Sequence, residues 1–164
     1  MTARNGRTPA ALPNPTAVTA LARRAGRLAA DLDAAGQEMA AIGGDTGQVG
    51  YRLDAAGAAI RAAIDDLQAA GAALARMRRA AAPGRCGLPW GVCPEHGATL
   101  VSTGGQTGCT RCARSWDYHH LCAPCTESVT HLLADAHGGT LRLCTGHAHA
   151  ARTTVVGGSI RVLA

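Results

Sequence analysis

The amino-acid sequence predicts an α+β fold, in which an N-terminal antiparallel helical hairpin precedes a small module rich in cysteine and histidine. The first observation is a sharp change of composition near residue 83. All seven cysteines and all seven histidines follow this point, whereas the residues before it are rich in alanine. The second observation is the helical spacing of the larger apolar residues in the first half. The third is that aromatic residues make up only 2% of the chain, so the second half needs metal ions or disulfides in place of a large core.

The first predicted helix begins at residue 15 and carries a heptad seam of apolar residues. Asn14 followed by Pro15 is a typical helix start, because the side chain caps the helix and proline suits its first position. Gly43-Gly44 is expected to end it. The seam has a regular 3-4-3-4 spacing, which is typical of an amphipathic, coiled-coil-like helix. Its members are Val18, Leu21, Ala25, Leu28, Leu32, Ala35, Met39 and Ile42.

A second helix follows after a short connection, so residues 15–82 are expected to form an αα-hairpin. Asp45 with Gln48 resembles a capping box at its start. Gly57 and Gly71 occupy two of its seam positions, where small residues let backbones approach. The larger seam residues are Leu53, Ile60, Ile64, Leu67 and Leu74. Alanine-rich helices bury little surface, so we expect residues 15–82 to pack on a second copy, on the zinc-binding module or on another protein. Residues 1–14 are expected to be disordered.

The first group of candidate metal ligands follows a linker predicted at residues 83–92 and opens a module predicted at 93–164. Its members are Cys93, His96, Cys109 and Cys112. Each pair has a gap of two residues, which lets a tight turn aim two side chains at one ion, while turn N–H groups stabilise the thiolate. Residues 98–102 and 106–107 flank Gly104-Gly105 as a plausible β-hairpin. This arrangement is typical of a zinc ribbon.

The second group has the same kind of paired spacing, and it raises the expected content to two zinc ions per chain. Its members are Cys122, Cys125, Cys144 and His147. Strand-forming segments at 128–134 and 140–143 separate the pairs, a helix is expected at 145–152, and a last strand at 153–163. Ligands in the first turn of a helix are typical of a treble-clef-like finger.

The sequence does not decide the identity of one ligand in the second group. Cys122 is the least certain member, and a nearby histidine could substitute for it. The candidates are His119, His120 and His149. Cys86 is left over, either as a thiol of the linker or as a replacement for one of the other ligands.

Nucleic-acid binding is a competing interpretation of the second half. Trp116 and Tyr118 are two residues apart and share a face on a strand, where they could cover the metal site or stack on a nucleobase. Arg111 and Arg114 could contact phosphate. The chain carries a net charge of +5, but residues 86–164 hold five arginines and four acidic residues. A nearly neutral module argues against tight binding to the phosphates of a nucleic acid.

Two resemblances to enzymes lack the residues that the chemistry needs. Cys122-Ala-Pro-Cys125 resembles the redox motif of thioredoxins, which requires a βαβ context that is not visible here. Cysteine pairs with Asp117-Tyr-His119-His120 resemble HNH nucleases. That motif needs a later asparagine, whereas the asparagines of this chain are Asn5 and Asn14. We therefore expect no enzymatic activity, with an HNH-like nuclease as a remote alternative.

Three motifs resemble those of small actinobacterial and actinophage proteins that pair an alanine-rich helical N-terminus with a cysteine- and histidine-rich tail. The motifs begin at Cys93 (Cys-Pro-Glu-His-Gly), at Cys109 (Cys-x-x-Cys-x-Arg-Ser-Trp-x-Tyr) and at Cys144 (Cys-Thr-Gly-His-Ala). The resemblance covers the second half in motif detail and the first half in character. It implies zinc binding and an actinobacterial setting, and it carries no assigned activity.

The sequence as a whole favours a non-catalytic, zinc-binding interaction or adaptor protein, with the hairpin used for oligomerisation or partner docking. A zinc-dependent nucleic-acid-binding regulator is the alternative. The first residues show no secretory pattern and no window is apolar enough for a membrane span. We therefore expect a cytoplasmic protein that does not contact membranes.

Overall fold

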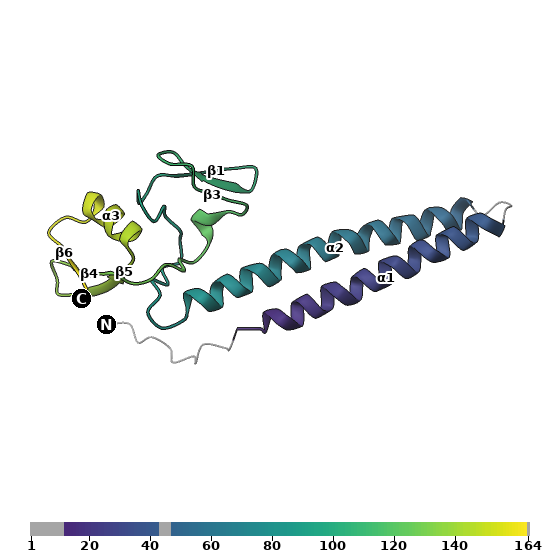
Figure 1. Ribbon diagram of the computed structural model, residues 1–164, viewed down its shortest axis with the longest axis horizontal. Helices are drawn as coiled ribbons and strands as arrows, with labels where there is room; N and C mark the ends of the chain where they lie inside the picture. The colour runs from purple at the N-terminus through teal and green to yellow at the C-terminus, as the bar shows by residue number, and fades with distance from the viewer. Residues whose placement is uncertain (1–11, 43–46, 164) are drawn as a thin grey trace. The chain divides into compact units, whose positions relative to one another are not determined.

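A computed structural model describes residues 12–42 and 47–163, and it divides the chain into two compact units, Met1–Ala75 and Arg76–Ala164. Two long helices, α1 (Pro15–Ile42) and α2 (Gly47–Ala80), come first, and small antiparallel sheets follow (Figure 1). The predicted α+β class is thereby confirmed. No helix among the described residues has both the length and the apolar character needed to cross a membrane.

Helix α1 begins where the sequence predicts. The side chain of Asn14 accepts a hydrogen bond of 3.1 Å from the backbone N–H of Thr16, and Pro15 takes the first helical position. The predicted end at Gly43-Gly44 and the capping box at Asp45 lie outside the described residues. So do residues 1–11 of the segment that is predicted to be disordered.

The seam of α2 is the predicted one, whereas the seam of α1 is rotated. In α2, Gly57 and Gly71 are buried and the larger seam residues between them are partly buried. In α1, Ala22 and Ala29 are buried, while Leu21 and Leu28 are exposed. The apolar stripe of α1 is wider than one heptad seam, and the hairpin uses the side with the smaller residues. The less exposed line in α1 is Val18, Ala22, Ala25, Ala29, Leu32, Gly36 and Met39.

The first sheet of the second unit contains the hairpin predicted around Gly104-Gly105. Strand β1 (Leu100–Thr103) pairs with β2 (Gln106–Cys109), which pairs with the short strand β3 (Ser115–Trp116). Both glycines have positive φ angles, 59° and 82°, which suits a tight two-residue turn. The hairpin carries Cys109 at its end.

The second sheet has the order β5-β4-β6 and packs against helix α3 (Thr145–Thr154). Its strands are β4 (His131–Ala134), β5 (Thr140–Leu143) and β6 (Ser159–Val162). The last strand is shorter than predicted, because α3 continues to Thr154 and a turn at Gly157, with a φ angle of 73°, precedes β6. Leu133, Leu143 and Ala148 form a small core here, with Leu88, Ala151 and Ile160 packed around it.

Two glycines hold helix α3 against the turn that carries Cys93. A side chain at Gly97 would meet the backbone N–H of Ala150 at 2.9 Å. A side chain at Gly146 would overlap the carbonyl oxygen of Cys93 and approach a methyl group of Val92 at 2.9 Å. The close approach of these backbones joins the two halves of the Arg76–Ala164 unit.

Candidate metal centres

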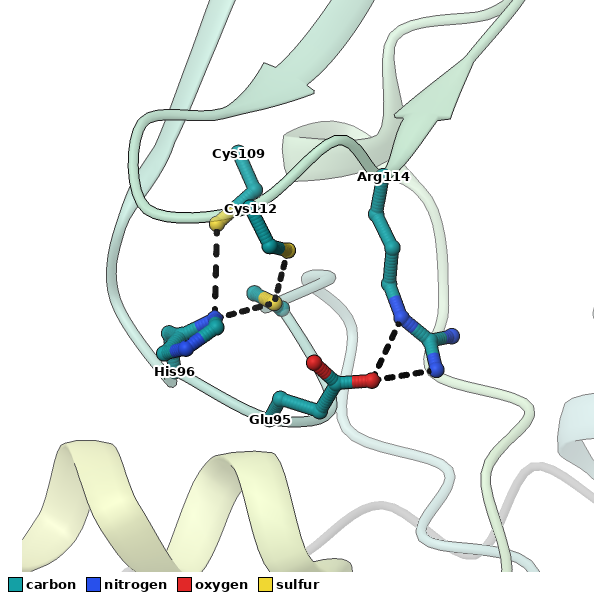
Figure 2. Close-up of polar contacts among 6 residues, drawn as sticks. Glu95, His96, Cys109, Cys112 and Arg114 are labelled. Carbon is teal, nitrogen blue, oxygen red and sulfur yellow. Dashed lines mark hydrogen bonds and ion pairs between the residues drawn. The ribbon is translucent and has the colours of Figure 1, made fainter.

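The first metal centre brings together all four side chains predicted for it: Cys93, His96, Cys109 and Cys112. Figure 2 shows the side chains of His96, Cys109 and Cys112 pointing toward one another. The Cys93 sulfur lies 3.6 Å from Nδ1 of His96 and 3.9 Å from the Cys112 sulfur. The Cys109 sulfur lies 3.8 Å from the same histidine nitrogen. These four residues could hold a metal ion.

The first turn is closed by a pair of backbone hydrogen bonds. Cys93 and Gly97 exchange hydrogen bonds of 2.9 Å in both directions, and Gly97 has a φ angle of 69° that glycine adopts readily. This tight turn aims Cys93 and His96 at the same point. Cys109 and Cys112 reach that point from the end of β2 and the turn after it.

Hydrogen bonds prepare the Cys109 sulfur to carry negative charge. Partial burial raises the pKa of this thiol. Hydrogen bonds from the Thr99 hydroxyl, at 3.2 Å, and from the Arg111 backbone N–H, at 3.4 Å, outweigh that effect and lower the pKa to about 6. A thiolate is the form that binds metal. Nearby, Arg114 donates to the carboxylate of Glu95 at 2.6 Å and 3.0 Å, which ties the two turns together (Figure 2).

The second centre differs from the prediction by one residue. The four side chains brought together are Cys86, Cys125, Cys144 and His147. Nδ1 of His147 lies 3.5 Å from the Cys86 sulfur and 3.2 Å from the Cys144 sulfur. The sulfurs of Cys125 and Cys144 are 3.7 Å apart. All seven cysteines of the chain are free thiols.

Cys86 reaches this centre because its segment pairs with the segment around Cys125. The backbone N–H of Cys86 donates to Glu127 at 2.9 Å, that of Cys125 to Leu88 at 2.8 Å, and that of Val129 to Gly84 at 2.8 Å. A bridge between Arg85 and Ser128 completes this short ladder. Part of the predicted linker, residues 83–92, therefore belongs to the metal-binding unit.

The prediction that Cys122 is a ligand was wrong. Cys122 ends the short 3₁₀ helix η1 (His120–Cys122), and its side chain is exposed. The three histidines considered as substitutes also lie outside the group, since His119 and His149 are exposed and His120 makes other contacts. Cys86 takes the place predicted for Cys122 in this group, which is one of the alternatives left open by the sequence.

The second centre favours a thiolate at Cys86. Hydrogen bonds from Cys125 and Cys144 hold the pKa of Cys86 far below its usual range, whereas the hydrogen bonds with Cys144 and Cys86 raise the pKa of Cys125. Burial lowers the pKa of His147, but the thiol partners Cys144 and Cys86 outweigh it and raise the value to about 9. The thiolate at Cys86 and the protonated His147 form a charge pair, and a metal cation could take the place of the proton. Cys144 and His147 come from the N-cap and first turn of α3, where backbone N–H groups point outward.

The four candidate nucleic-acid contacts do not form one free surface. Trp116 stacks on the ring of His120 with 4.2 Å between centroids, and the guanidinium of Arg76 lies 4.0 Å over the ring of Tyr118. Arg114 is paired with Glu95. Arg111 is exposed, and its backbone N–H points at Cys109. One face of each aromatic ring is therefore already covered, which favours the interpretation that these rings form a small core.

Buried His120 makes the Arg76–Ala164 unit sensitive to pH. Burial lowers its pKa below the ordinary value of 6.5, and the hydrogen bond with the Val92 carbonyl offsets this only in part. The unfolded chain therefore binds more protons near pH 6, so stability is full above about pH 6.5 and falls below it. The loss is at most about 1.4 kcal/mol per pH unit.

Between pH 5 and pH 7, the unfolding temperature should change less steeply with pH for His120→Gln than for the wild type. His119→Gln, at an exposed neighbour, should keep the wild-type slope, and equal slopes in all three would contradict this assignment.

An apolar cavity of about 380 Å³ lies within the Arg76–Ala164 unit. It is lined from both sheets, from η1 and from α3. Its apolar lining includes Leu88, Trp90, Leu121, Leu133, Leu141 and Val155. The size and apolar character suit a large apolar side chain or a small ligand.

No protein-family model, curated protein or solved structure matches this chain. Inference about function therefore starts from the geometry of the two centres.

Proposed function

We propose that the protein is a non-catalytic interaction protein whose second unit is folded around two structural zinc ions. One observation carries this proposal: the spacing of the eight ligand atoms. A tetrahedral zinc ion with bonds of about 2.3 Å to sulfur and 2.0–2.1 Å to nitrogen sets its ligands about 3.8 Å apart for two sulfurs and about 3.6 Å apart for sulfur and nitrogen. Six of the twelve atom pairs in the two groups lie 3.2–3.9 Å apart, close to those values, and all atoms of a group lie within 4.8 Å of one another.

The chemistry of the ligands supports zinc over other metals and structure over catalysis. Each group offers three cysteine sulfurs and one histidine nitrogen, a set that zinc prefers and that calcium or magnesium does not. Four protein ligands fill a tetrahedral zinc ion, whereas a catalytic zinc keeps one position for water or substrate. An HNH-like nuclease needs an open metal position, whereas each group here offers four protein ligands.

The positions of the candidate ligands support a finer fold assignment, which we propose for each group. The first group sits on two turns around a β-hairpin, as in a zinc ribbon. The second resembles a treble-clef finger in its β-hairpin and in the two ligands at the start of a helix. It departs from that pattern in its first two ligands, because Cys86 and Cys125 come from paired segments rather than from one turn.

The apolar cavity supports a role in binding a protein partner. His147 of the second group lines this cavity, so an ion bound at that group would also help to shape the cavity. The proposed partner inserts an apolar side chain there, and the helical hairpin provides a second surface for docking. In this view the protein acts as an adaptor.

A pair of matched variants tests this role. Leu141 lies at the cavity and is 43% exposed, whereas Val101 is 53% exposed and does not line it. Proteins captured by the wild type and by Val101→Asp, but lost with Leu141→Asp at equal zinc content, would support the proposal. An identical set of captured proteins for all three forms would overturn it.

Nucleic-acid binding is expected to be weak and non-specific. Residues 86–164, which carry Arg111 and Arg114, are nearly neutral, whereas the whole Arg76–Ala164 unit holds nine arginines and four acidic residues because Arg76, Arg78, Arg79 and Arg85 lie at its start. Arg114 and Tyr118 are engaged within the chain. A regulator that neutralises several phosphates would lose affinity steeply as salt rises. Fluorescence anisotropy with labelled DNA and RNA should therefore show no binding tighter than about 10 µM at 150 mM salt. A tighter, steeply salt-dependent complex would favour the regulator.

A further inference from the structure

Helix α1 carries an exposed apolar line that the hairpin does not use. Leu21, Leu28 and Ile42 are 49%, 52% and 73% exposed. With partly buried Ala35 they recur at intervals of seven residues, so they form one line along the helix. The contacts with α2 are made by the neighbouring line that contains Ala22 and Ala29. A helix with two adjacent apolar lines is built to contact two other helices.

The charges of α1 indicate what kind of helix covers this line. Its basic residues all lie in the N-terminal half of the helix, and its acidic residues all lie in the C-terminal half. The basic residues are Arg23, Arg24 and Arg27, and the acidic ones are Asp31, Asp33 and Glu38. Asp33 is already paired with Arg61 of α2 at 3.1 Å. A second α1 helix running antiparallel would therefore place opposite charges side by side, whereas a parallel one would place like charges together.

We propose that the partner of this hairpin is a second copy of the chain, joined through antiparallel α1 helices along Leu21, Leu28, Ala35 and Ile42. This inference rests on the proposed docking role of the hairpin and names its partner. In such a two-fold dimer Leu21 meets Ile42 of the partner subunit, and Arg24 lies beside Glu38 of the partner subunit. The same patch is used by both copies, as two-fold symmetry requires. The result is a four-helix bundle that covers the exposed line.

One charge opposes this arrangement. Asp31 lies near the two-fold axis and approaches Asp31 of the partner subunit. Removing that repulsion with Asp31→Asn should tighten the dimer several-fold, and weakening of the dimer by this variant would count against the proposed register.

Sedimentation equilibrium on the full, zinc-loaded chain tests the dimer. The wild type should dimerise at micromolar concentrations, and Leu28→Asp should weaken the dimer about 100-fold or more because it buries a charge. Tyr51→Asp is the matched control: Tyr51 is 70% exposed on α2, away from the seam, and the variant should leave the dimer unchanged. Circular dichroism should show the same helix content in all three. A wild type that stays monomeric at about 100 µM, or equal effects of the two variants, would overturn the dimer.

Charge reversal tests the antiparallel direction. Arg24→Glu alone should weaken the dimer, because the new glutamate would lie beside Glu38 of the partner subunit. By symmetry this repulsion occurs at both ends of the interface. Arg24→Glu combined with Glu38→Arg should restore it. In a parallel dimer the single change would have little effect and the double change would restore nothing, which would overturn the proposed direction. Zinc content separates the two proposals: a monomer with two zinc ions removes only the dimer, whereas a chain without zinc removes the proposed function.

Discussion

Replacing Cys86 by serine should lower the zinc content of the chain from two ions to one, whereas replacing Cys122 by serine should leave two. Cys86 lies in the second centre with His147 3.5 Å away, and Cys122 is exposed and outside it. Losing one of four ligands opens a tetrahedral site, and metal binding in such a small unit is folding free energy. Both variants replace one cysteine sulfur by oxygen, so each is a control for the other.

The loss of stability in Cys86→Ser should be large. Structural zinc in small domains supplies apparent binding free energies of about 10–16 kcal/mol, so losing about half of it is comparable with the whole stability of a domain, about 5–15 kcal/mol. Elemental analysis after gel filtration gives the zinc content, and thermal unfolding followed in the β-sheet signal gives the stability. Two zinc ions in Cys86→Ser and one in Cys122→Ser would contradict the assignment of the second centre.

Gly146→Ala should destabilise the Arg76–Ala164 unit by about 3 kcal/mol, at the upper end of the range for overpacked sites. The new methyl group would overlap the Cys93 carbonyl oxygen and lie 3.0 Å from Cα of Pro94. These are backbone atoms of the turn that carries Cys93 and His96, so they cannot move without shifting a candidate metal ligand. The usual gain of about 1 kcal/mol from replacing glycine by alanine in a helix is too small to compensate.

Gly108→Ala is the matched control for this effect. Gly108 lies in β2 of the same unit, and a side chain there would meet nothing within 4 Å. Its unfolding temperature in the zinc-loaded form should remain close to that of the wild type. If Gly146→Ala is as stable as Gly108→Ala, then helix α3 is not held tightly against the turn that carries Cys93.

The helices, the hairpins and seven of the eight ligands could be predicted from the sequence because they depend on local spacing. The gap of two residues between Cys109 and Cys112 is enough to predict that they form a ligand pair. Cys86 has no such partner nearby, since it meets Cys125 only through the ladder between residues 84–88 and 125–129. Pairing between distant segments leaves no signal in spacing, and the apparent pair Cys122 and Cys125 suggested a turn instead.

The seam of α1 was predicted incorrectly for a related reason. Spacing finds every apolar position of a helix but does not rank two adjacent lines against each other. The leucines appeared to be the natural seam because they are large. The hairpin instead buries Ala22 and Ala29, and the choice depends on the shape of α2, which no pattern within α1 contains.

The most direct test of the central claim is a count of zinc ions and reactive thiols on the native chain. We expect two zinc ions and one thiol, Cys122, that reacts rapidly with a thiol reagent, because the other six cysteines are the candidate zinc ligands. After chelation all seven should react and the Arg76–Ala164 unit should unfold. Fewer than two zinc ions, or several fast thiols in a folded, zinc-loaded chain, would contradict it.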